Sequence, residues 1–232
     1  RYGGDFWGLS WAQEDYDGAF LDAHGLEKGN LYKLINASFS SNLAVDMVNQ
    51  RRYQGAFAVS DGTDGAAIQT GLLTSQTTEW LRARVNCDAW FRYHAICEAV
   101  RHYDFWPEAN KNAAWYFSPP YNASNGFFGQ FWTLPWDTDS SWGASWNSGQ
   151  DLVYAGIFNF GSHPDLARDY RNTVREIRDL LFQPDQINPM LDALAARIAP
   201  FVPADLARWS NAPTAGGSYR SMASFAGFST PA

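Results

Sequence analysis

The sequence from His102 to Gly143 reads HYDFWPEANKNAAWYFSPPYNASNGFFGQFWTLPWDTDSSWG, and this stretch decides the fold. It begins at the end of an aromatic helix pattern and passes through an acidic loop into a strand that ends at Phe117. A polar turn follows, and a second strand begins at Phe131 and runs into a second acidic loop. The pattern predicts two strands, joined by a turn, whose outer ends carry acidic residues.

Four polar residues at those outer ends form the candidate site. Because a turn joins the strands, Asp104 and Asn112 can lie close to Asp137 and Asp139, although they are distant in sequence. Carboxylate and amide oxygens bind hard divalent cations, and a remaining aspartate can orient or deprotonate a hydroxyl. Asp and Asn also form turns and cap helices, which is the structural alternative for each residue. The Trp and Tyr neighbours of these acids favour a functional site.

The composition is that of a packed globular protein. Of 232 residues, 46% are hydrophobic and 18% are charged, and the 11 tryptophans predict an aromatic core and aromatic clefts. The net charge of −7 argues against nucleic acid or an anionic membrane as a partner. No apolar run approaches the ~20 residues that a membrane span needs. The chain begins at Arg1 without Met, so a processed or truncated N-terminus is expected.

Helix signals are clearest between residues 77 and 103 and in the last third of the chain. Thr77 or Thr78 is expected to cap a short helix through Arg84, and Asp88 to cap a longer one. Later helices are expected over 165–182, 184–198 and 203–209, where Pro164, Pro184 and Pro203 lie at or near the starts. The longer helix should bury one stripe of side chains, at Trp90, Tyr93, Ile96, Val100 and Tyr103.

Neither the two cysteines nor the two histidines of this helical stretch are expected to form a metal site. Cys87 and Cys97 would lie ~15 Å apart along one helix, too far for a disulfide, so both should be free thiols. His94 is expected to pack in the core or to cap a neighbouring loop. His102, two residues before Asp104, has the better claim to a supporting role at the site.

The N-terminal third predicts short elements. Residues 6–12 are expected to form a strand that is apolar on both faces, which is typical of an interior strand. Asp15 and Asp17 should precede a short helix that ends at Gly25, and residues 31–35 should form another strand. The run from Asp61 to Gly65 is expected to be a loop, and it lacks the full ligand set of a calcium site.

Several of these segments together resemble the spore-coat protein H (CotH) kinase family. They are GDFWGL at 4–9, EDYD at 14–17, Phe20-Leu21 and GNLYK at 29–33, followed by Tyr103-Asp104, residues 112–116 and PWDTD at 135–139 before Gly143. Their combination and order carry the resemblance, which spans roughly residues 3 to 180. CotH proteins are atypical protein kinases that use ATP and a divalent metal, and they phosphorylate proteins outside the cytosol, notably in the spore coat.

The resemblance implies an α+β, atypical protein-kinase-like fold, mostly the hinge and the helical large lobe, with an incomplete small lobe. Residues 1–35 would be the remnant of the small lobe and the hinge. Residues 36–210 would be the large C-terminal lobe, and residues 211–232 a tail or linker.

The resemblance also implies roles for the site residues. Asp104 would be the catalytic aspartate that orients the acceptor hydroxyl, while Asn112, Asp137 and Asp139 would bind Mg²⁺ or Mn²⁺. The spacing from Asp104 to Asn112 is longer than in most kinases, so Asn110 competes with Asn112.

The nucleotide and the partners are likewise implied by the resemblance. Glu14, after the strand into the hinge, and Asn110 would contribute to binding ATP. The lysine that contacts the phosphates and its glutamate partner would precede Arg1, since neither Lys33 nor Lys111 matches that lysine by position. The 232 residues alone are therefore expected to bind ATP weakly, and either upstream sequence or another chain should cover the N-terminal strand. The substrate would be a protein with Ser or Thr acceptors, outside the cytoplasm.

The sequence is also compatible with two other functions. A pseudokinase or an extracellular binding scaffold would keep the fold without turnover. A carbohydrate-active protein would use tryptophan-lined clefts and paired carboxylates, although Asp137 and Asp139 are too close in sequence to suggest separate acid and base residues. Titration with nucleotide, with and without magnesium, separates these functions.

Overall fold

The computed structural model describes residues 8–9, 14–34, 51–53, 55, 64–65, 76–100, 102, 113–120, 129–138, 141 and 162–209. The chain folds into two compact units. One comprises Glu14–Arg178, and the other comprises Arg1–Gln13 together with Asp179–Ala232. The candidate site lies in the first unit. None of the helices in the described ranges is long and apolar enough to cross a membrane.

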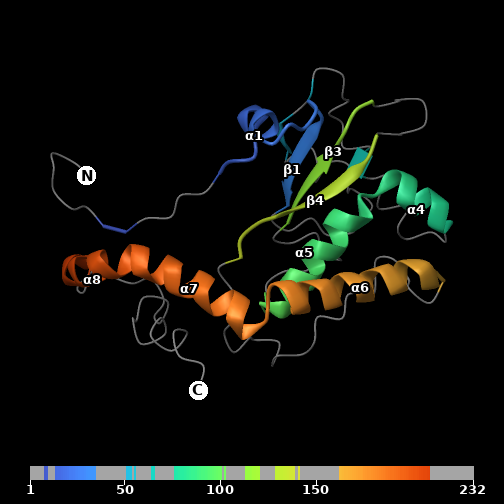
Figure 1. The fold of residues 1–232 in the computed structure, drawn as a ribbon. Helices are drawn as coiled ribbons and strands as arrows, with labels where there is room; N and C mark the ends of the chain where they lie inside the picture. The colour runs from blue at the N-terminus through green and yellow to red at the C-terminus, as the bar shows by residue number, and fades with distance from the viewer. Residues whose placement is uncertain are drawn as a thin grey trace. The chain divides into compact units, whose positions relative to one another are not determined.

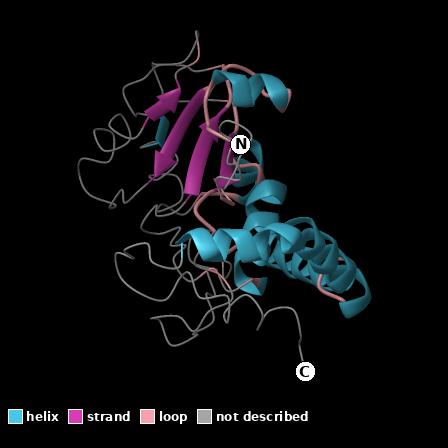
Figure 2. Ribbon diagram, turned by 90° about the vertical axis from the view of Figure 1, so that its left-hand side faces the viewer, coloured by secondary structure: helices cyan, strands magenta, loops and turns pink. Residues whose placement is uncertain are grey.

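A four-stranded antiparallel sheet is the centre of the Glu14–Arg178 unit (Figures 1 and 2). Its order is β2-β1-β3-β4. The strands are β1 (Asn30–Leu34), β2 (Arg51–Tyr53), β3 (Ala113–Phe117) and β4 (Phe131–Pro135). The predicted pair of strands that ends at Phe117 and begins at Phe131 is confirmed, as is the strand expected over 31–35, which begins one residue early.

Side chains alternate along each strand, so each strand contributes residues to both faces of the sheet. Different helices cover these two faces. On one face, Leu31, Ala114 and Tyr116 form a cluster with Phe20 and Leu21 of α1 (Gly18–Ala23). On the other face, Tyr32, Trp115, Phe117 and Phe131 pack against residues of α4 (Thr78–Arg84), α5 (Cys87–Ala99) and α6 (Pro164–Leu180). The sheet is therefore a middle layer between two aromatic clusters.

Helix α1 forms as its sequence predicts. Asp17 is its N-cap, and Oδ1 accepts hydrogen bonds from the N–H groups of Ala19 and Phe20 at 2.7 and 3.0 Å. Gly25 follows the helix with φ +64°, a left-handed conformation that glycine adopts without steric cost.

The starts of α4 and α5 are set by side-chain caps. Thr77 caps α4 as predicted, with Oγ1 accepting from Trp80 N at 3.1 Å. The cap of α5 is Asn86, whose Oδ1 accepts from Ala89 N at 2.9 Å, so the prediction of Asp88 was wrong by two residues. Asn86 N also donates to Phe131 O at 2.8 Å, which ties the start of α5 to β4.

The buried face of α5 differs from the predicted stripe. Trp90 and Tyr93 are buried as expected, but Ile96 is 37% exposed, and the helix ends at Ala99 before Tyr103. Phe91, His94 and Cys97 are the buried neighbours instead, because α5 packs between the sheet and α6 and so needs a wider apolar face. Cys87 and Cys97 lie on this helix as free thiols, which confirms that prediction.

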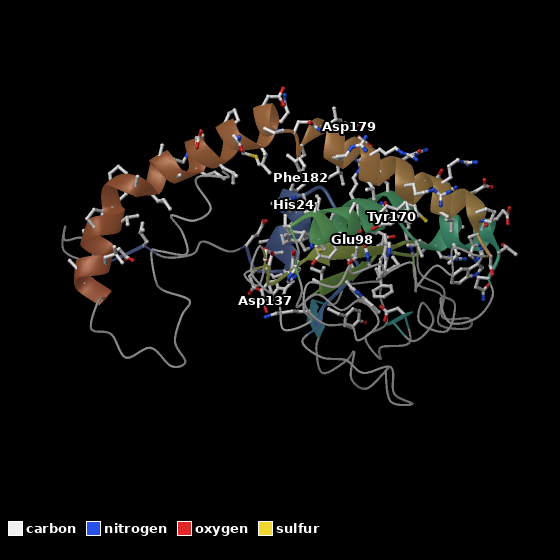
Figure 3. All side chains as sticks on the ribbon, turned by 90° about the horizontal axis from the view of Figure 1, so that it is seen from below. His24, Glu98, Asp137, Tyr170, Asp179 and Phe182 are labelled. Atoms are coloured by element: carbon white, nitrogen blue, oxygen red, sulfur yellow. The ribbon has the colours of Figure 1, made fainter. Side chains whose placement is uncertain are left out.

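Helix α6 packs alongside α5 (Figure 1). The Phe91 and Tyr170 rings lie 5.7 Å apart, and Arg92 pairs with Glu176 at 3.3 Å. Tyr170 also forms a side-chain hydrogen bond with Glu98, and the two are neighbours in Figure 3. The arginines and aspartates of α6 form the predicted exposed, ion-paired face, as in the pair of Arg168 with Asp165 at 2.8 Å.

The other unit contains α7 (Pro184–Ile198), a 3₁₀ turn η2 (Ala199–Phe201) and α8 (Val202–Trp209). Both helices were predicted from their proline starts. Leu9 N donates to Asp205 Oδ1 at 2.7 Å within this unit. Gly8 and Leu9, the described part of the range 6–12, are not in a strand, so the predicted strand is wrong at these two positions.

The observed class is mixed α+β, and the kinase-like arrangement of two lobes stays a prediction, as do the boundaries at residues 35 and 210. Within the predicted loop at 61–65, Asp64 and Gly65 are helical and buried. Asp64 accepts hydrogen bonds from Asn30 Nδ2 at 2.8 Å and Tyr32 Oη at 2.9 Å. It therefore holds this segment to β1 as a structural residue.

Candidate functional site

The register of β3 and β4 brings together the strand ends that carry the candidate site. Ala113, the first residue of β3, pairs with Pro135 at the end of β4 and with Leu34 at the end of β1. Three strands therefore have one end at this edge of the sheet. In the sequence, Asn112 immediately precedes Ala113, and Asp137 follows Pro135 by two residues. The two strand ends that carry the predicted site residues therefore meet, as the turn between the strands implied.

Asp137 is the predicted metal ligand that the structure describes (Figure 3). Its side chain is exposed, and its backbone has φ 56°, the one positive φ found at a non-glycine residue among the described residues. Asp and Asn adopt this left-handed conformation more readily than other residues with a Cβ. Just past Asp137, Ser141 Oγ donates to Thr138 O at 2.8 Å.

The other predicted site residues are placed as follows. Asp104, Asn110, Asn112 and Asp139 lie outside the described residues, so their convergence on Asp137 stays a prediction. Glu14 is exposed, and its Oε2 lies 2.9 Å from His24 Nε2, just past the end of α1. Its assignment to nucleotide binding also stays a prediction.

Two tyrosines from opposite sides of the sheet hold the segment that leads to Asp137. Tyr16 Oη donates a hydrogen bond to Pro135 O. Tyr93 Oη, from α5, accepts a hydrogen bond from Trp136 N at 3.3 Å. The Tyr16 and Trp136 rings lie 5.6 Å apart, so the segment is bound both through its main chain and through an aromatic contact.

Burial keeps both tyrosine hydroxyls neutral. Burial, with a smaller contribution from the charge of Glu14, raises the pKa of Tyr16 to about 12. Burial also raises the pKa of Tyr93 well above its usual value. Both hydroxyls therefore stay protonated through the physiological range, and their bonds to residues 135 and 136 do not depend on pH there.

A lysine from β1 completes this support. Lys33 Nζ lies 3.8 Å from the centre of the Trp136 ring, a cation–π contact. The ammonium is thus held over the residue that immediately precedes Asp137, on the face of the sheet that α1 covers.

His102, which the sequence places near the candidate site, is anchored to the end of α5. His102 is fully buried, and its N–H donates to Cys97 O at 2.8 Å, which ties it to the last turn of α5, beyond the C-cap Val100. The predicted supporting position of His102, two residues before Asp104, is therefore a well-anchored one. His94 packs on Trp90 at 4.5 Å, and burial lowers its pKa to about 3, so it is a neutral core residue.

The donor chemistry of the predicted set suits a hard cation. Asp137 supplies an exposed carboxylate, and the partners expected beside it add carboxylate and amide oxygens, the donors that Mg²⁺ and Mn²⁺ prefer. The residues that the structure describes include no group of three His, Cys, Asp or Glu side chains able to hold a metal. Of the predicted ligands, Asp137 alone lies among those residues.

Comparison with known families decides the relationship. The family model described as CotH kinase protein matches residues 2–227. The chain belongs to the CotH kinase family. This confirms the resemblance drawn from its motifs, and CotH membership indicates a kinase-like function. No curated protein matches the sequence.

Sequence reasoning missed the residues that hold the segment before Asp137. Tyr16 and Lys33 lie inside segments that carry the resemblance, but nothing local in those segments shows that they reach Pro135 and Trp136. Tyr93 was predicted to be buried, without its bond to Trp136. The sequence carries one weak indication of these contacts, because a buried tyrosine or lysine needs a polar or aromatic partner. The sequence does not show which residue is that partner.

Proposed function

We propose that this chain is an ATP- and divalent-metal-dependent phosphotransferase of the CotH type, a protein kinase. The observation that carries the proposal is the pairing of Ala113 with Pro135, in a chain matched by the CotH family over residues 2–227. That pairing supports a site in which Asn112 and Asp137 act together. Family membership supports the kinase-like chemistry.

Phosphoryl transfer needs alignment and charge neutralisation more than covalent chemistry from the protein. In the proposed reaction a Ser or Thr hydroxyl of an acceptor protein attacks the γ-phosphorus, the bond from that phosphorus to the bridging oxygen breaks, and ADP leaves. Asp104 orients the hydroxyl and accepts its proton. Asp137, with Asn112 and Asp139, holds the metal, and Asn110 and Glu14 contact the nucleotide.

A divalent cation held by Asp137, Asn112 and Asp139 would offset the negative charge of the phosphates. The contribution of this chain is to fix Asp137. Tyr16 and Tyr93 bind the main chain of residues 135 and 136, so the carboxylate is presented from a segment that is held on both sides. We place the acceptor proteins outside the cytoplasm, at a cell surface or spore coat, as expected for this family.

The experiment compares nucleotide binding and phosphate transfer in two variants. Asp137→Asn keeps the side-chain shape and tolerates the left-handed backbone, but it removes the charge. It should abolish magnesium-dependent ATP binding. Asp104→Asn should bind ATP normally and lose transfer. Asp185→Asn, an exposed position in the first turn of α7, is the control and should change neither.

The outcomes separate the candidate functions. Equal loss of binding in Asp137→Asn and Asp104→Asn contradicts the assigned roles. Magnesium-dependent binding by the wild type with no transfer to any protein indicates a pseudokinase or scaffold. Binding of oligosaccharides without binding of ATP indicates a carbohydrate-active protein and overturns the proposal.

A further inference from the structure

The charged side chains of α6 are sorted by sign onto different sides of the helix. Its acidic residues lie toward α4 and α5, where Asp169 pairs with Arg82 at 2.5 Å and Glu176 pairs with Arg92 at 3.3 Å. The outer side carries three exposed arginines, Arg168, Arg171 and Arg175. Spacings of three and four residues place these arginines on one face of the helix. Figure 3 shows nitrogen-tipped side chains on the side of α6 that faces away from α5.

Two of these arginines are not neutralised by a carboxylate. Arg168 pairs with Asp165 at 2.8 Å, but the ion pairs of the described residues include neither Arg171 nor Arg175. Arg175 Nη1 donates to Asn172 Oδ1 at 3.0 Å, which is a neutral acceptor and uses one of the five N–H donors of the guanidinium. Two positive charges therefore remain together on the outer side of α6, in a chain whose net charge is −7.

The spacing of the two arginines fits an extended acidic segment. Arg171 and Arg175 are four residues apart, which is ~6 Å along the axis of an α-helix. In an extended chain, side chains two residues apart lie on the same side and are ~6.6 Å apart. Carboxylates at alternate positions of such a chain can therefore each meet one guanidinium, which binds a carboxylate through two parallel hydrogen bonds.

The row of arginines is narrow, which favours a single peptide chain over a broad anionic surface. The exposed carboxylates of Asp165 and Glu176 lie on the neighbouring side of the same helix. A lipid surface or a nucleic acid would bring phosphates against these carboxylates as well, and like charges repel. An extended peptide can lie along the arginines without covering the acidic side.

We infer that Arg171 and Arg175, with Arg168 beside them, form a docking surface for an extended acidic segment of a protein partner, with carboxylates at alternate positions. None of these residues belongs to the candidate site, so the surface goes beyond the proposed function and needs neither ATP nor a metal. Exposed ion pairs are individually weak and are screened by salt. Binding should therefore depend on both arginines and weaken as the ionic strength rises.

The test is fluorescence anisotropy of a short labelled peptide, in which glutamate and glycine alternate, titrated with the full 232-residue chain at low ionic strength. Replacing both arginines, as Arg171→Gln with Arg175→Gln, should weaken binding by about tenfold, and either change alone by about threefold. Arg171→Lys with Arg175→Lys should keep part of the affinity, because the charges remain and the paired hydrogen bonds are lost. A peptide with glutamine in place of glutamate should not bind.

Arg197→Gln is the control for each single variant. Arg197 is also an exposed arginine, in the last turn of α7, so its loss changes the net charge equally and should leave the affinity for the peptide unchanged. The melting temperature of each variant shows whether it is folded, and the lysine pair serves where the glutamine pair is not. A peptide with its glutamates in one block should bind more weakly than the alternating peptide.

Several results would overturn the inference. A wild type that does not bind the alternating peptide does so, as does a folded glutamine pair that binds it equally well. Equal weakening by Arg197→Gln would show an effect of net charge alone. Binding to vesicles of anionic lipid but not to the peptide, lost in the glutamine pair, would assign the surface to a membrane instead. Because no nucleotide is present, none of these results bears on the proposed function.

Discussion

The bond from Tyr16 to Pro135 gives a sharp test of how Asp137 is held. Tyr16→Phe removes one hydroxyl and keeps the ring, which is 8% exposed and packs edge-on against Phe20 at 4.7 Å. The aromatic contacts therefore remain, and the lost hydrogen bond should lower the free energy of unfolding by ~0.5–1.5 kcal/mol. For a chain of this size each ~1 kcal/mol lowers the melting temperature by ~2–4 °C.

The effect on the site should be larger than the effect on stability. Groups that orient metal ligands typically change metal affinity by about 10- to 100-fold when they are removed. Tyr16→Phe should therefore weaken magnesium-dependent ATP binding by about tenfold, measured by calorimetry at a temperature well below unfolding. Adenosine binding should change much less, because it does not use the metal.

Tyr116→Phe is the matched control for this prediction. Tyr116 belongs to the same cluster, and its Oη donates to the main-chain oxygen of Glu27 at 2.8 Å, but it pairs with Leu31 toward the other end of β1. Tyr116→Phe should lower the free energy of unfolding by a similar amount to Tyr16→Phe, and it should leave the affinity for ATP unchanged. If both variants weaken ATP binding equally, or if neither does, the bond from Tyr16 to Pro135 does not position Asp137.

Three further predictions follow from burial. His94 has a pKa of about 3 in the folded chain, below its usual value, so the unfolded chain binds this proton more readily. The contribution of His94 to stability should therefore be full above about pH 6.5 and be lost as the pH drops toward 3. His94→Phe should flatten that part of a profile of melting temperature against pH. Tyr16 and Tyr116 have pKa values of about 12, above their usual value, so stability should be full below about pH 10 and fall between pH 10 and 12. Without reductant, Cys87 and Cys97 should both react with a thiol reagent after denaturation, and neither should react quickly when folded, because burial raises both thiol pKa values; a single reactive thiol or none would contradict the free pair.

Local patterns were sufficient for most of the secondary structure. The strands β3 and β4 were predicted because their apolar runs are bounded by turn residues, and the helices α6, α7 and α8 because prolines lie at or near their starts. The family was also recognised from short motifs in a fixed order, which the match over residues 2–227 confirms. These signals depend on neighbours in the sequence.

The errors arose where distant contacts decide the outcome. Asn86 rather than Asp88 caps α5, because the chain is also bonded to Phe131 of β4 at that point. Ile96 is exposed because packing against β4 and α6 decides which face of α5 is buried. The spacing of apolar residues along one helix carries no information about those neighbouring elements. The contacts of Tyr16 with Pro135 and of Lys33 with Trp136 join residues from opposite halves of the unit, so no local pattern indicates them.

Both aromatic clusters bind the segment that leads to the candidate site residue Asp137. Tyr16 belongs to the cluster on the α1 side of the sheet, and Tyr93 to the cluster on the α5 side. Both bind consecutive residues of the same segment, Pro135 and Trp136. A left-handed backbone costs ~1–2 kcal/mol for an ordinary residue with a Cβ, and less for Asp. Two hydrogen bonds, each worth ~0.5–1.5 kcal/mol, are enough to offset that cost at Asp137. Because the bonds come from opposite faces, loosening either cluster should displace the Asp137 carboxylate, so core substitutions on either side of the sheet should affect metal binding before they unfold the protein.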